Sequence, residues 1–107
     1  GLAERLAALI DASRGLERLS DPELSIVCFR FRPEDAMGDA AVDELNQRIM
    51  ETVQAEGRVF VTNAIVGGRF ALRACVLHFG TTEADLAALC EAVADVGARL
   101  LAQKRLG

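Results

Sequence analysis

Two apolar, strand-like segments, residues 58–65 and 69–77, are separated only by Val66-Gly67-Gly68. β-Branched and aromatic side chains are frequent in both segments, which favours β-strands. A connection this short permits only antiparallel pairing, because parallel strands need a crossover of a dozen or more residues. Glycine also suits the positive φ angles of a tight hairpin turn. The hairpin therefore predicts an antiparallel sheet at the centre of the fold.

Helical and strand-like segments flank this hairpin on both sides. Apolar residues at helical spacing predict helices over residues 2–13, over residues 40–56 and from Thr82 onward. Residues 23–32 are expected to form a strand that Pro33 closes, and residues 16–20 a short one. This order predicts an α+β two-layer sandwich, in which three helices cover one face of a mostly antiparallel sheet of three or four strands.

The expected helix boundaries follow from capping residues. Asp39 is the expected N-cap of the middle helix, and Gly57 is its expected stop. Thr82 and Asp85 have the spacing of a capping box at the start of the last helix. The first helix begins at Gly1 without such a signal, as if a longer helix had been cut. We therefore expect the 107 residues to be one domain excised from a longer chain.

The segment 69–77 is apolar on both sides. Phe70 and Leu72 point to one face, and Ala71, Arg73 and Cys75 point to the other. In an antiparallel sheet covered by helices on one face, the second face is normally polar. The pattern predicts that another domain or subunit covers the second face. The alternative is that the first helix crosses over and covers it.

Arg73 is the one cation inside this apolar segment. A buried guanidinium needs a partner, and its planar fork suits a carboxylate. One interpretation is a structural ion pair, with an acid of this chain or of a neighbouring domain. The other is a contact with the carboxylate of a substrate or cofactor. The residues alone leave both open.

Composition excludes several classes of protein. A net charge of −4 and a pI near 4.9 lack the basic surface of a nucleic-acid binder. No apolar stretch reaches the roughly 20 residues that span a membrane. Cys28, Cys75 and Cys90 are expected to be buried, reduced thiols of a cytoplasmic protein. His78 is the only histidine, so no metal site is expected, and we interpret it as a surface or loop residue.

No catalytic motif is complete within the chain. Nucleophile motifs and phosphate-binding glycine loops are absent from the sequence. Lys104 is the only lysine and lies near the C-terminus, a poor place for a Schiff base that needs desolvation. The chain alone is therefore expected to be inactive.

A series of short motifs resembles the C-terminal small domain of the pyridoxal-phosphate-dependent group II amino-acid decarboxylases, the family of aromatic-L-amino-acid, tyrosine, histidine and glutamate decarboxylases. The resemblance runs from about Leu2 to Leu101. In chain order, its motifs are Leu24-Ser25-x-Val27-Cys28-Phe29-Arg30, Leu45-Asn46, Gly57-Arg58-Val59-Phe60, Leu72-Arg73 and Thr81-Thr82-x-x-Asp85.

The resemblance implies a small domain that packs against a large, cofactor-binding domain of the same chain, in an intertwined homodimer. Pyridoxal phosphate would be held by a lysine of the large domain, so this chain would bind no cofactor, metal, nucleic acid or membrane. The strand arginine that matches Arg73 approaches the active site in some relatives and is structural in others. The resemblance therefore implies either a substrate-carboxylate contact or an interdomain contact for Arg73.

Two other functions are compatible with the sequence. A free-standing α+β interaction or ligand-binding module would use the second sheet face as its docking surface. Alternatively, the parent enzyme could keep pyridoxal phosphate and catalyse another reaction, since aminotransferases and other carbon–carbon lyases share the architecture.

Overall fold

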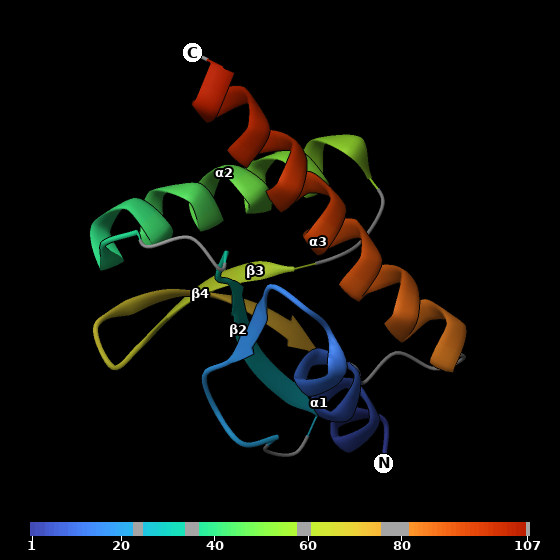
Figure 1. Cartoon of the computed structure of the whole chain (residues 1–107). Coiled ribbons are helices and arrows are strands. Elements are labelled where there is room, and N and C mark those ends of the chain that lie inside the picture. The colour runs from blue at the N-terminus through green and yellow to red at the C-terminus, as the bar shows by residue number, and fades with distance from the viewer. Residues whose placement is uncertain (23–24, 34–36, 58–60, 76–81, 107) are drawn as a thin grey trace.

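The described residues of the chain form three helices and one four-stranded sheet (Figure 1). The computed structural model describes residues 1–22, 25–33, 37–57, 61–75 and 82–106. In chain order the elements are α1 (Leu2–Ala12), β1 (Leu16–Arg18), β2 (Ile26–Phe31), α2 (Asp39–Glu56), β3 (Thr62–Val66), β4 (Arg69–Cys75) and α3 (Glu83–Leu106). The strands pair antiparallel in the order β1-β2-β4-β3. The predicted α+β class is confirmed.

The first two strands are shorter than predicted, whereas β3 runs one residue further, to Val66. β1 ends at Arg18, and β2 begins at Ile26 within the described residues. The ends predicted at residues 23–24, 58–60 and 76–77 lie outside the described residues, as does His78. None of the helices in the described ranges is both long and apolar enough to cross a membrane.

Helix capping follows the sequence at two of the three predicted positions. Gly57 ends α2 with a φ of 67°, a conformation that glycine adopts without strain. At the start of α3, the Thr82 N–H donates to Asp85 and the Asp85 N–H donates to the Thr82 hydroxyl. The prediction that Asp39 caps α2 is wrong. Gly38 is the N-cap. Asp39 lies in the first turn, where its negative charge interacts favourably with the positive end of the helix dipole.

The hairpin turn is one residue tighter than predicted. Val66 belongs to β3 and pairs with Arg69, so only Gly67 and Gly68 form the connection. Both glycines have positive φ angles, 58° and 78°, as a type I′ turn requires. The turn sets the register of the whole hairpin, from Val66 opposite Arg69 to Thr62 opposite Arg73.

A single hydrophobic core lies between the helices and one face of the sheet, as predicted. Val27 and Phe29 of β2 and Leu72 of β4 are fully buried in it. Leu6 and Ile10 of α1 join the same core, so α1 lies on the side of α2 and α3. The alternative in which the first helix covers the opposite face is therefore wrong. We call the face with this core the helix face.

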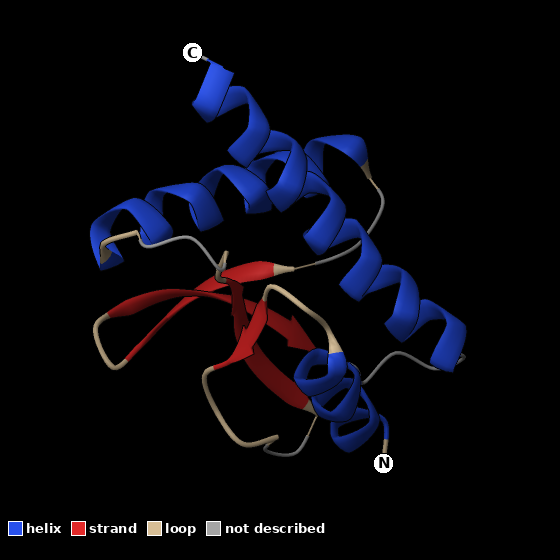
Figure 2. Cartoon of the chain, in the orientation of Figure 1, coloured by secondary structure: helices blue, strands red, loops and turns tan. Residues whose placement is uncertain are grey.

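The prediction that both faces of the strands are shielded from solvent is wrong for β3. Thr62, Asn63 and Ile65 are exposed, and Ile65 retains 68% of its accessible surface. β3 is an edge strand, and the hairpin extends away from α1 and α3 (Figure 2). Alternating apolar residues in the sequence could not show that this strand lies at the edge of the helical layer.

Helix α2 separates β2 from β4 at one end of the sheet. The register of these two strands runs from Ile26–Cys75 to Phe29–Leu72 and stops there. Beyond it, the N–H and C=O of Phe31 bond to the side chain of Asn46, at 2.8 and 2.9 Å. The N–H of Phe70 donates to Asp43 at 3.0 Å. Two side chains of α2 thus replace the backbone ladder at this fork.

Candidate carboxylate-binding face of the sheet

The sheet face opposite the helix face, which we call the far face, carries the predicted site residue. Strand alternation and register assign residues to this face. They are Glu17 of β1; Ile26, Cys28 and Arg30 of β2; Thr62, Ala64 and Val66 of β3; and Arg69, Ala71, Arg73 and Cys75 of β4. Three arginines thus share this face with one acid.

Arg73 lies in the middle of the far face. It pairs with Cys28 on one side and with Thr62 on the other. Its side chain is half-buried, and within the described ranges no hydrogen bond or ion pair joins it to another residue. An ion pair between Arg73 and an acid of the described chain is therefore not part of this structure. The guanidinium remains available to a carboxylate from outside these residues.

Among the described residues, Arg30 is the most deeply buried charge, although no pattern in the sequence indicated it. Its residue exposure is 0%, whereas Arg73 is half-buried. The Nε of Arg30 donates to Glu17 Oε1 at 2.7 Å, across the β1–β2 pair. Its Nη1 lies 3.8 Å from Asp39 Oδ1 at the start of α2. The expectation of a buried, ion-paired guanidinium thus applies to Arg30.

Arg30 is only partly satisfied by these contacts. Its Nη1 and Nη2 atoms are buried and have no hydrogen-bond partner among the described residues. Burial of a cation is unfavourable unless a paired charge and hydrogen bonds compensate it, so removal of Glu17 would leave Arg30 with only the longer contact to Asp39. The alternation Phe29-Arg30-Phe31-Arg32 did not predict a buried arginine, because polar residues at alternate strand positions normally face solvent.

The three cysteines differ in exposure. Cys28 and Cys90 are buried, as predicted, whereas Cys75 is exposed at the end of β4. Cys75 pairs with Ile26, and Cys28 pairs with Arg73, so the two far-face thiols are diagonal neighbours. Diagonal positions in a sheet lie about 7–8 Å apart, beyond the reach of an unstrained disulfide. All three thiols are free.

We expect iodoacetamide to modify Cys75 at least about tenfold faster than Cys28 or Cys90 in the folded chain, because the reacting thiolate must be accessible. Burial also raises the pKa of the Cys90 thiol, which lowers its thiolate fraction further. Mass spectrometry over a time course measures the three rates on peptides cleaved after glutamate, because Glu83 lies between Cys75 and Cys90. The Cys75→Ser variant should lose the fast phase, and equal rates at all three sites would contradict this structure.

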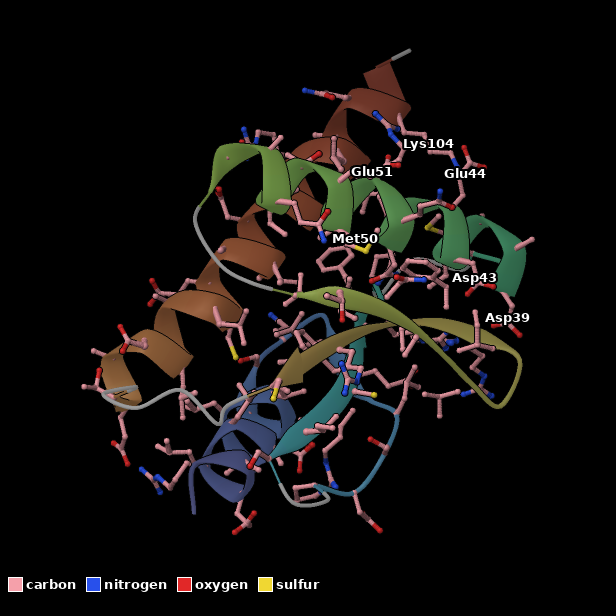
Figure 3. All side chains as sticks on the ribbon, turned by 180° about the vertical axis from the view of Figure 1, so that it is seen from behind. Asp39, Asp43, Glu44, Met50, Glu51 and Lys104 are labelled. Carbon is pink, nitrogen blue, oxygen red and sulfur yellow. The ribbon has the colours of Figure 1, made fainter. Side chains whose placement is uncertain are left out.

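Lys104 does not provide a site for pyridoxal phosphate. It is exposed near the end of α3, beside Glu44 of α2 (Figure 3). The two residues line a shallow cavity of about 250 Å³ with Leu45, Arg48 and Gln103. A Schiff-base lysine needs a desolvated site, and this open surface does not supply one. Nor do the described residues contain a cluster of three or more His, Cys, Asp or Glu suited to a metal ion.

Comparisons with known proteins point to one group of enzymes. No protein-family model matches the sequence. Tyrosine decarboxylase 1 of Narcissus pseudonarcissus is 31% identical over 77 residues, which cover 67% of this chain and 15% of that enzyme. The chain thus spans less than a fifth of the length of this curated relative.

Solved structures agree in fold. One is Oryza sativa TDC with pyridoxal phosphate and tryptamine, with a TM-score of 0.83 and 25% identity, over 92% of this chain and 21% of that one. Another is the glutamate decarboxylase domain of a Vibrio parahaemolyticus transaminase–decarboxylase, with a TM-score of 0.81 and 26% identity, over 92% and 20%. In sequence and in fold, the chain is therefore related to the group II pyridoxal-phosphate-dependent amino-acid decarboxylases, over a segment that makes up about one fifth of their length.

Proposed function

We propose that this chain is the C-terminal small domain of a pyridoxal-phosphate-dependent amino-acid decarboxylase. The observation that carries the proposal is the match of 92% of the chain to one fifth of a decarboxylase bound to pyridoxal phosphate. In this proposal the domain packs against a large cofactor-binding domain of the same polypeptide. The complete enzyme is a cytoplasmic homodimer and needs neither a membrane nor a nucleic acid.

The large domain, in this proposal, holds the cofactor. Pyridoxal phosphate supplies an electron sink for the carbanion that remains when carbon dioxide leaves. Lys104 does not fit the role of the cofactor lysine, because it is exposed and undesolvated. The contribution of this chain is therefore to orient the substrate carboxylate, exclude water and complete the active-site wall.

Arg73 is the residue we assign to that contribution. It lies on the far face, half-buried and without a partner among the described residues. A carboxylate of the substrate or of the large domain would satisfy its guanidinium bidentately. Cys28 and Thr62 flank it and limit the directions from which a carboxylate can approach.

The complete enzyme tests this function. Its full-length reading frame should encode a lysine-bearing domain before these residues, and the purified protein with pyridoxal phosphate should release carbon dioxide from an amino acid. A panel of tyrosine, tryptophan, phenylalanine and glutamate covers aromatic and acidic substrates. The 107-residue chain alone, mixed with pyridoxal phosphate, is the control and should form no imine absorbance. If the enzyme transaminates these amino acids and releases no carbon dioxide, the proposed decarboxylation is wrong.

In that enzyme, Arg73→Gln should lower kcat/KM by about 10- to 100-fold, the loss expected for one hydrogen-bonded charge pair. A substrate contact predicts a raised KM that Arg73→Lys partly restores, whereas an interdomain contact predicts a lower Tm with KM nearly unchanged. Arg48→Gln, an exposed cation on α2, is the matched control. If Arg73→Gln changes neither kinetics nor Tm, Arg73 has neither role.

A free-standing interaction module is the second candidate. The exposed edge of the sheet at β3 favours it, because Thr62, Asn63 and Ile65 are open to solvent there. An independent gene that encodes only this domain would support this function, whereas a decarboxylating full-length enzyme would exclude it as the main role.

A further inference from the structure

We draw no further inference here: the strongest candidate, the buried Arg30 cluster where β2 meets the first turn of α2, carries nothing beyond the contacts already described, because Glu17 and Asp39 balance its charge and its two Nη atoms are too deeply buried for a ligand to reach.

Discussion

Replacing Asn46 with leucine is expected to lower the free energy of unfolding by about 3 kcal/mol, because two buried backbone groups lose their partners. Asn46 is fully buried in α2, and its side chain bonds both the N–H and the C=O of Phe31. It also donates to the Val42 carbonyl at 2.8 Å. Leucine has the same number and branching of side-chain heavy atoms but can make none of these bonds, so each Phe31 group would be buried without a partner.

Urea unfolding monitored by circular dichroism measures this loss for Asn46→Leu. The matched control is Gln47→Leu, at the exposed neighbouring position on the same helix, which should change stability by no more than about 0.5 kcal/mol. If the two variants were equally stable, the contact between Asn46 and Phe31 would not hold the strand to the helix.

Substituting Gly97 with valine is expected to destabilise the chain by about 3 kcal/mol, the upper part of the range for overpacked cores. A Cβ atom at position 97 would lie 2.6 Å from Cδ1 of Phe31 and 2.7 Å from its Cγ. Phe31 is itself only 6% exposed within the core, so its ring has little room to move. The absence of a side chain at Gly97 is therefore what lets α3 pack against β2.

A second substitution identifies the cause of this loss. Phe31→Leu removes the ring, so the double variant with Gly97→Val should recover about 1 kcal/mol or more relative to the sum of the single changes. Ala98→Val, at the exposed adjacent position of α3, reports helix propensity alone and should lose less than about 1 kcal/mol. Additive effects at Gly97 and Phe31 would show that the two residues do not share this space.

Local patterns in the sequence were sufficient to predict the element order and the hairpin. Hairpin geometry depends on two neighbouring glycines, and Gly67 and Gly68 supply it whatever surrounds them. Helix capping at Gly57 and Thr82 is likewise a property of a few adjacent residues. Apolar spacing at 2.0 and 3.6 residues then separates strand from helix.

Features that depend on distant residues were not predictable in the same way. Whether Arg30 or Arg73 is the buried cation depends on Glu17 and Asp39, which approach Arg30 only in the folded chain. The exposure of Ile65 and Cys75 depends on how far the helices extend over the sheet, which no local pattern records. For the candidate site, the sequence predicted Arg73 and its strand. Only the structure shows that Arg73 has no ion-pair partner among the described residues.

The fork between β2 and β4 has a mechanical consequence. Because the two strands share no backbone ladder beyond Phe29 and Leu72, the twist of the sheet does not fix the direction of the outer hairpin. Asn46 holds one strand and Asp43 holds the other, three residues apart on the same helix. The position of α2 therefore helps to set the direction of this end of the hairpin relative to the core.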